Sequence, residues 1–166
     1  MSSTRKAVIV RKFSRDWLAG YVTGEFGQQG DELEVLDSSG RLTRIPWKQV
    51  KWLCFVRDFA QSGDRGDPER LLRRRFALRP RQAGLWLRLR LADGDELEGL
   101  AANDRSLIDG AGIMMSPPDM RSNTQRLYIP RTAIETLTVL ALIGNNHRQP
   151  AGSAEQPELF PAAIDT

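Results

Sequence analysis

The sequence predicts a mainly β protein made of two tandem five-stranded barrels joined by a short linker helix. Three observations predict this architecture. The chain contains an internal repeat, leucine alternates with other residues in one segment, and an Ile-Pro dipeptide precedes the same short turn in each repeat. Alternation with a period of two residues indicates a strand, and several short strands between turn formers are typical of a small barrel. The 166 residues are enough for two small domains.

The first part of the repeat relates residues 8–21 (VIVRKFSRDWLAGY) to residues 87–100 (LRLRLADGDELEGL), with an offset of 79. Each segment has the pattern of a strand, a turn and a second strand. In the second segment, Asp93-Gly94 provides residues that tolerate the positive φ of a hairpin turn. We therefore expect a β-hairpin at the start of each copy.

The second part of the repeat relates residues 44–56 (RIPWKQVKWLCFV) to residues 128–140 (YIPRTAIETLTVL), with an offset of 84. Pro46 thus falls on Pro130. A proline cannot donate to a sheet ladder, and its fixed φ suits the first position of a helical turn. We predict one 3₁₀-like turn after each proline, between two strands. Matching halves in the same order predict two copies of one fold.

These patterns divide the chain into four parts. They are a first barrel at residues 5–60, an arginine-rich linker at 61–84, a second barrel at 85–144 and a disordered tail at 145–166. In the linker, Asp67-Pro68-Glu69 supplies an N-cap, a proline for the first helical position and an acid near the helix N-terminus. Pro80 ends the predicted helix by Arg79. The tail is rich in Pro, Ala and Gln and has no periodicity, which is typical of disorder.

The composition argues against a membrane protein and against an enzyme. No apolar run approaches the ~20 residues that span a bilayer, and Arg11 and Lys12 interrupt the apolar run near the N-terminus, so we expect a cytoplasmic protein. One histidine, His147, lies in the predicted tail, and one cysteine, Cys54, lies in an apolar strand. Metal sites need clusters of such residues, and so do catalytic Ser-His-Asp triads and Cys-His pairs. We therefore expect no catalytic residues, no metal and no cofactor.

The Ile-Pro turn with its flanking strands resembles the Sm-like and SH3-like small barrels. LYIPRTAIETLTV (residues 127–139) is similar to the second Sm motif, and Leu97-Glu98-Gly99 lies where the first Sm motif ends its second strand. As a pair, the copies resemble a bacterial family of tandem barrels with no assigned activity, over most of residues 6–144. Sm proteins form rings by pairing edge strands. The resemblance implies that a tandem chain pairs its own two copies or builds a smaller ring.

Arginines of the linker are the main candidates for a binding site. The guanidinium group matches phosphate bidentately, so a strip of arginines favours nucleic-acid binding. The competing interpretation is a solvated helix face that pairs with acids on the two barrels. Arg131 is a further candidate, although Pro130-Arg131 departs from the Arg-Gly that RNA-binding Sm proteins carry at this position, so the resemblance does not imply their uridine pocket. The candidate nucleic-acid-binding residues are Arg70, Arg73, Arg74, Arg75, Arg79, Arg81 and Arg131.

Four tryptophans provide large apolar surfaces, of which Trp47 and Trp52 are candidates for contacts with bases or a proline-rich peptide. Burial between the copies is the expected role of at least two of the four.

The predicted function is a non-catalytic binding or scaffold protein, with an RNA-binding or other nucleic-acid-binding regulator as the alternative. We expect a protein partner or self-association, including a homo-oligomer. The net charge of +3 allows binding to nucleic acid without requiring it.

Overall fold

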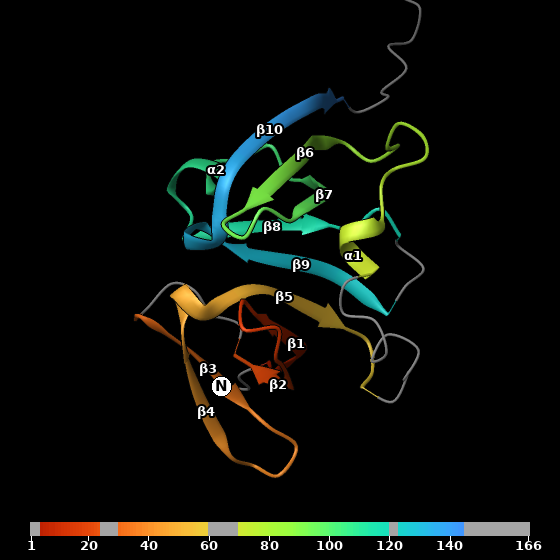
Figure 1. The fold of residues 1–166 in the computed structure, drawn as a ribbon. Helices are drawn as coiled ribbons and strands as arrows, with labels where there is room; N and C mark the ends of the chain where they lie inside the picture. The colour runs from red at the N-terminus through yellow and green to blue at the C-terminus, as the bar shows by residue number, and fades with distance from the viewer. Residues whose placement is uncertain (1–3, 24–29, 60–69, 120–122, 145–166) are drawn as a thin grey trace, which may run out of the picture.

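The chain forms one antiparallel sheet of ten strands in the computed structural model of the protein (Figure 1). The structure describes residues 4–23, 30–59, 70–119 and 123–144. The described helices are single turns of three or four residues, so the predicted mainly β class is confirmed. None of these helices is long and apolar enough to span a membrane.

The two halves of the chain contribute the same series of strands. The first half contains β1 (Lys6–Lys12), β2 (Trp17–Val22), β3 (Glu32–Leu36), β4 (Leu42–Pro46), the 3₁₀ helix η1 (Trp47–Gln49) and β5 (Val50–Val56). The second half contains α1 (Arg70–Arg73), β6 (Gly84–Leu91), β7 (Glu96–Ala101), α2 (Ser106–Asp109), β8 (Gly112–Ser116), β9 (Thr124–Pro130), the 3₁₀ helix η3 (Arg131–Ala133) and β10 (Ile134–Ile143).

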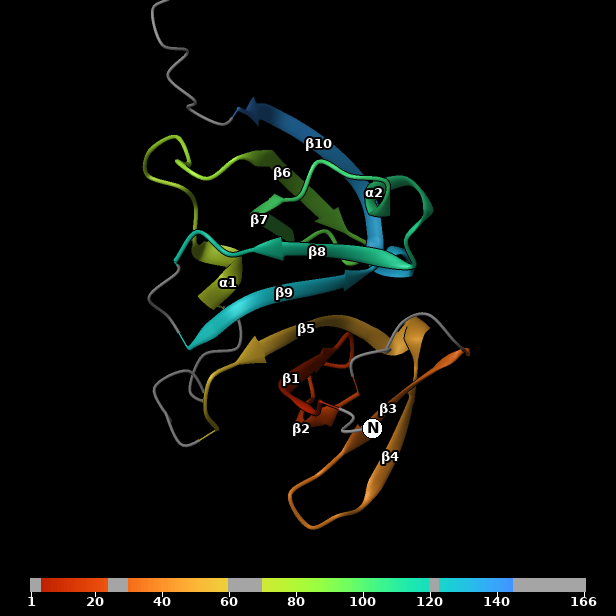
Figure 2. The same ribbon diagram turned by 180° about the vertical axis from the view of Figure 1, so that it is seen from behind.

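The strand order across the sheet is β10-β6-β7-β8-β9-β5-β1-β2-β3-β4. In each half the fifth strand pairs with the first, and the second, third and fourth follow, so the internal repeat is visible in the topology. The prediction of two separate barrels needs correction. Because β5 pairs with β1 on one side and with β9 on the other, the described strands form one sheet that is not closed. Figures 1 and 2 show the two halves one above the other, with β5 and β9 side by side between them.

The predicted turns after the two Ile-Pro pairs are confirmed. Pro46, at φ −55°, precedes η1, and Pro130, at φ −61°, precedes η3. Each turn leads directly into the fifth strand of its half, β5 or β10. The Asp93-Gly94 turn also forms between β6 and β7, with Gly94 at φ 89°.

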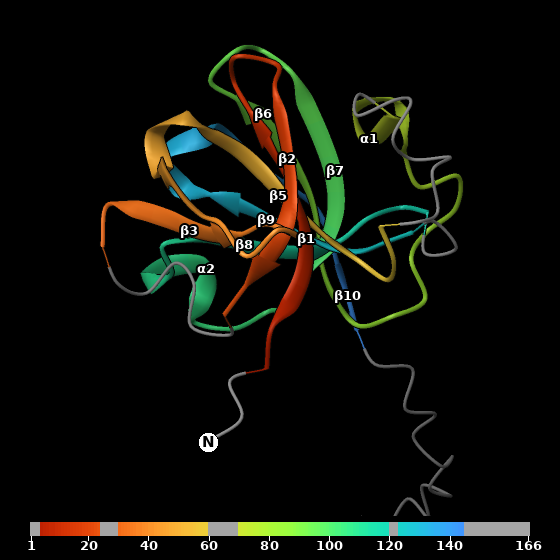
Figure 3. The ribbon, with the colours of Figure 1, turned by 90° about the horizontal axis from the view of Figure 1, so that it is seen from below.

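The linker helix ends earlier than predicted. α1 ends at Arg73 rather than near Arg79, and the expected N-cap, Asp67, lies outside the described residues. Beyond α1, the backbone N–H of Phe76 donates to the carboxylate of Glu98 on β7, at 3.1 Å, instead of to a helical carbonyl. Figure 3 shows α1 beside the sheet, on the side opposite α2. The predicted disordered tail, residues 145–166, also lies outside the described residues.

Two hydrophobic clusters form the core, and β5 contributes to both. Leu53 and Phe55 pack with side chains of the first half. Trp52 and Cys54 face the other side of the sheet and pack with leucines of the second half. This division follows from the alternation of side chains along a strand. Tyr128 of β9 joins the first cluster in return, so each half completes the core of the other.

Candidate functional site

The structure disperses the seven candidate arginines instead of gathering them in one strip. Arg70 Nη2 lies 3.0 Å from a carboxylate oxygen of Asp119. Arg75 lies 3.6 Å from a carboxylate oxygen of Glu98 and 3.9 Å from one of Glu96. Arg70 and Arg75 therefore pair with acids of the second half, as the competing interpretation of the arginine strip expects.

Two further candidates donate to backbone carbonyls. Arg79 Nη2 donates to the carbonyl of Leu142 in β10, at 3.3 Å. Arg131 donates to the carbonyls of Leu107 and Gly110, at 2.6 and 2.9 Å, and so fastens the α2 segment to η3. The other three candidates lie at the exposed surface of the linker. They are Arg73, which has an interaction partner, Arg74 and Arg81.

Glu98 is the buried polar group beneath the linker, and sequence analysis did not single it out as a site. Its Oε1 accepts hydrogen bonds from the Trp86 indole at 2.8 Å and from the Phe76 backbone at 3.1 Å. Arg75 and Arg88 each place a nitrogen 3.6 Å from its Oε2. The Phe76 ring also packs against Trp86, edge to face, with centroids 5.7 Å apart. This cluster fixes the linker on β6 and β7. Its one signal in the sequence is the hairpin turn at Asp93-Gly94, which places Arg88 opposite Glu98.

The two candidate tryptophans lie at the junction of the halves rather than on an open surface. Trp52 is buried and belongs to the cluster of the second half. Trp47 is partly buried, and its ring packs against Tyr128 of β9 with centroids 5.9 Å apart. Burial raises the pKa of the Tyr128 phenol, and the nearby positive charge of Arg131 opposes that rise. Both tryptophans therefore serve the packing between the copies.

A buried ion pair also joins the halves. Lys51 of β5 is buried, and its Nζ lies 2.6 Å from Asp93 and also contacts Asp95, in the turn between β6 and β7. The ammonium group lies 5.0 Å from the centroid of the Trp52 ring. Desolvation raises the pKa of Asp93, but its hydrogen bonds to Lys51 and to the Asp95 backbone outweigh this effect. The pKa of that carboxyl therefore lies below its ordinary value of 3.8.

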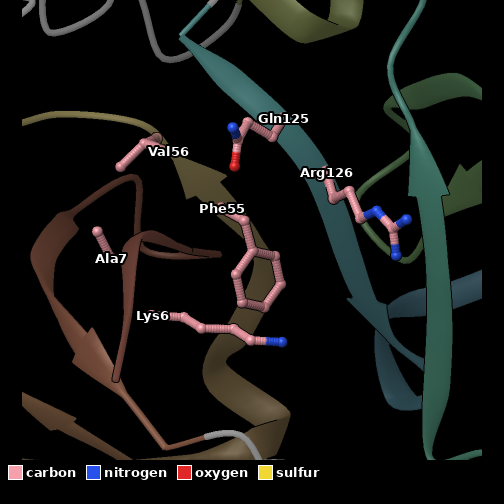
Figure 4. A pocket seen from close by; sticks show the side chains of 6 residues that line it. All are labelled: Lys6, Ala7, Phe55, Val56, Gln125 and Arg126. Atoms are coloured by element: carbon pink, nitrogen blue, oxygen red, sulfur yellow. The ribbon is translucent and has the colours of Figure 1, made fainter. Parts of the chain in front are cut away.

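A groove of about 430 Å³ crosses the junction where β1, β5 and β9 run side by side (Figure 4). Lys6 and Arg126 are exposed in this groove, and Gln125 lies beside them. Lys6 Nζ lies 5.9 Å from the centroid of the Phe55 ring, and Arg126 is the register partner of Phe55. Because the Phe55 ring is mostly covered, the groove offers two cations rather than a stacking platform. No group of three His, Cys, Asp or Glu side chains suited to a metal occurs among the described residues.

The last strand of the chain forms one edge of the sheet. β10 has ten residues and lies outermost, while β4 lies outermost at the opposite end (Figure 1). Leu137 and Val139 are register partners of Leu89 and Leu87, which are fully buried, so all four lie on the core face. Nevertheless, Leu137 is 40% exposed and Val139 is 51% exposed. The core of the second half is therefore open along β10.

A family model described as a family of unknown function (DUF6982) matches residues 4–141. The chain belongs to this family. The matched residues run from just before β1 into β10, so both halves of the sheet belong to the DUF6982 unit. No curated protein and no solved structure matches the chain.

The first half of this DUF6982 protein shows what covers the equivalent positions. Leu53 and Phe55 of β5 correspond to Leu137 and Val139 of β10 in the repeat. Leu53 and Phe55 are only 0% and 7% exposed. β9 pairs along the outer edge of β5, and Tyr128 of β9 enters the same cluster. Among the described residues, β10 has no strand on that side, and this accounts for the difference in burial.

The opposite edge of the DUF6982 sheet is β4, the counterpart of β9 in the repeat. Leu42 of β4 is 50% exposed and corresponds to Arg126 of β9. Arg44 corresponds to Tyr128, and its Nε lies 2.9 Å from a carboxylate oxygen of Glu34 on β3. Among the described strands, the exposed large apolar side chains lie on these two outermost strands, with Trp17 of β2 as the exception.

Proposed function

We propose that this chain is a non-catalytic binding or scaffold protein that accepts a partner strand along the outer edge of β10. The observation that carries the proposal is the contrast in burial between Leu137 and Val139 and their counterparts on β5. An edge strand presents a row of backbone N–H and C=O groups, and an extended partner can satisfy them. The same partner would cover the two half-exposed apolar side chains.

The sequence of β10 supports this role, because it lacks the charged residues and prolines by which proteins often protect an edge. Residues 136–143 contain no charged residue and no proline. The pairing of β10 with β6 has two irregular positions, and one of them skips Glu135. β5 skips the equivalent residue, Lys51, in its pairing with β1, yet β5 accepts β9. Such an irregularity is therefore compatible with strand addition.

The resemblance to Sm-like barrels belongs to the same proposal. Each half has its fifth strand beside its first, and in each half a proline and a 3₁₀ turn precede the fifth strand. These features support modules of the Sm-like kind that associate through their edges. They give no support to a particular ligand.

Strand addition to β10 can be tested with fluorescent eight-residue peptides that alternate valine or threonine with polar residues and that are not taken from this chain. Anisotropy would report binding, and hydrogen exchange would report protection of the amides at 136–140. We expect peptides to bind and to slow exchange in β10, and we expect Val139→Asp to abolish both effects. Ile108→Asp is the matched control, because Ile108 is also an exposed apolar residue but lies on α2, which packs against β8 and is not part of the strand edge. Failure of every peptide and of a second copy of the chain to protect β10 would overturn the proposal.

Nucleic-acid binding is the second candidate, and the groove with Lys6 and Arg126 favours it. Two cations that line one groove can bind the phosphates of a nucleic acid, and such binding weakens steeply with salt. We expect a generic single-stranded RNA to bind at low salt and Lys6→Glu with Arg126→Glu to remove that binding. Arg73→Glu with Arg74→Glu tests the linker separately. No change in RNA anisotropy at low salt would exclude this candidate.

A further inference from the structure

We infer that the partner strand for β10 is β4 of a second copy of this chain, added antiparallel in the register that β9 uses on β5. This inference rests on the proposed function of the β10 edge and names its partner. It starts from the junction inside the chain, where the fifth strand of one half pairs with the fourth strand of the other. The two outermost strands, β10 and β4, are again a fifth and a fourth strand. Two copies can therefore form the same kind of junction again.

The repeat gives the register of this second junction. In the chain, Leu53 pairs with Tyr128, Cys54 with Leu127 and Phe55 with Arg126. The offset of 84 residues carries β5 onto β10 and β9 onto β4. The resulting pairs between two copies are Leu137 with Arg44, Thr138 with Thr43, and Val139 with Leu42.

The side chains of two of these three pairs are complementary. Val139 and Leu42 are 51% and 50% exposed in the isolated chain, and the register places them directly opposite each other. Opposed apolar side chains on one face stabilise a strand pair, and so do opposed threonines such as Thr138 and Thr43. Leu42 would extend the core of the second half over Val139, as Tyr128 extends the core of the first half over Leu53.

The position of the two edges makes this association head to tail. β10 and β4 lie at opposite ends of the sheet, and Figures 1 and 2 show them far apart at the top and the bottom of the molecule. One copy therefore uses its β10 while its neighbour uses its β4, and each dimer keeps one edge of each kind. Such a heterologous contact allows further copies to add as the protein concentration rises.

The test uses two variants, each with one altered edge, studied by analytical ultracentrifugation over a range of concentrations. Val139→Asp alters β10 and leaves β4 intact, whereas Leu42→Asp alters β4 and leaves β10 intact. We expect the mass of the wild-type protein to rise with concentration and each variant alone to stay monomeric. An equal mixture of the two should form a 1:1 dimer and nothing larger, because only one good edge of each kind remains. Circular dichroism checks the folding of both variants, and Val139→Thr provides a milder change that should weaken association.

The mixture distinguishes this arrangement from the other pairings. Self-association of Leu42→Asp alone would indicate β10 against β10, and self-association of Val139→Asp alone would indicate β4 against β4. Either result would overturn the inference, as would a wild-type chain that stays monomeric at every concentration. If that monomer still shows peptide protection of β10, the proposed function stands and only the identity of the partner is wrong. If neither a peptide nor a second copy protects β10, both proposals fail.

A cysteine pair tests the register itself. Thr138→Cys with Thr43→Cys should give disulfide-linked dimers and larger species under mild oxidation, because opposed residues in a strand pair lie ~5 Å apart. Thr138→Cys with Ser39→Cys is the matched control, because Ser39 lies in the turn between β3 and β4, outside the strand that would pair with β10. Equal cross-linking of both pairs would contradict the register. The wild-type chain, whose Cys54 is buried, controls for linkage through the native thiol.

Discussion

Removing the two carboxylates around Lys51 should destabilise the protein more than removing Lys51 itself. The Lys51 side chain is 5% exposed, whereas those of Asp93 and Asp95 are 35% and 42% exposed. In Asp93→Asn with Asp95→Asn, a buried ammonium group loses both anions, and a buried charge without its partner costs ~3–5 kcal/mol. In Lys51→Met, an apolar side chain takes the buried position and the two carboxylates reach water, so a loss of about 1 kcal/mol is expected.

These values translate into a measurable difference in thermal and urea unfolding. For a protein of this size, 1 kcal/mol corresponds to ~2–4 °C in Tm. The double asparagine variant should therefore melt roughly 6–20 °C below the wild type. Lys51→Met should melt only about 2–4 °C below the wild type. The triple variant with Lys51→Met should recover stability relative to the double variant, because the unpaired charge is gone. If Lys51→Met costs as much as the double variant, or if the triple variant is the least stable, the reasoning about the buried charge is wrong.

Three further predictions concern the pH, the linker and the close contact between strands. Because the pKa of Asp93 is lowered in the folded protein, its contribution to stability is present above its ordinary value of 3.8 and is lost as the pH falls below it. Urea titrations from about pH 5 to pH 2 should show a smaller loss for Asp93→Asn than for the wild type. Glu98→Leu leaves two buried N–H donors without an acceptor and should cost ~2–4 kcal/mol in urea unfolding, whereas Glu98→Gln keeps an acceptor oxygen and should cost less. Gly20→Ala would place a Cβ 2.6 Å from the carbonyl oxygen of Leu36, so we expect a loss of ~1–3 kcal/mol, with Gly144→Ala, in open space, as the neutral control.

The fold within each half could be predicted from the sequence because its signals are local. Pro46 and Pro130 fix the same turn, and the alternation of leucines in β6 indicates which side chains enter the core. The pairing of β5 with β9 could not be predicted in the same way. It depends on which edges meet in space, and no short motif encodes that choice. Two closed barrels and one shared sheet therefore agree equally well with the repeat.

The candidate site was harder to predict for a related reason. A run of arginines indicates charge, but it does not indicate which arginines face solvent and which pair with acids far away in the sequence. Arg70 pairs with Asp119 and Arg75 with Glu98, and both contacts depend on the path of the linker across the second half. The open edge of β10 was also missed, because its apolar residues have the same pattern as a buried strand. Only the comparison with β5 in the structure distinguishes a covered strand from an uncovered one.

The repeat also indicates why an association between copies should be weaker than the junction inside the chain. Lys51 corresponds to Glu135, and Asp95 corresponds to Asp16 in the turn between β1 and β2. The proposed contact between copies would bring Glu135 towards Asp16, where the internal junction has a lysine and an aspartate. In the isolated chain, the carboxylate of Glu135 lies 3.2 Å from Arg90 at an exposed position. In the proposed junction, two like charges would therefore stand in place of the internal ion pair.

Glu135→Lys should restore the missing ion pair and tighten the association of copies. An ion pair at a partly exposed site contributes up to ~1 kcal/mol, and removal of the repulsion adds to it, so we expect an about threefold to tenfold lower dissociation constant by ultracentrifugation. Asp16→Asn in the same chain should remove most of the gain, because the new lysine then has no carboxylate opposite it. In the Leu42→Asp background, where the apolar contact of β4 is lost, Glu135→Lys should leave the protein monomeric. A gain that survives Asp16→Asn, or a loss of association in Glu135→Lys, would show that the second junction does not copy the first.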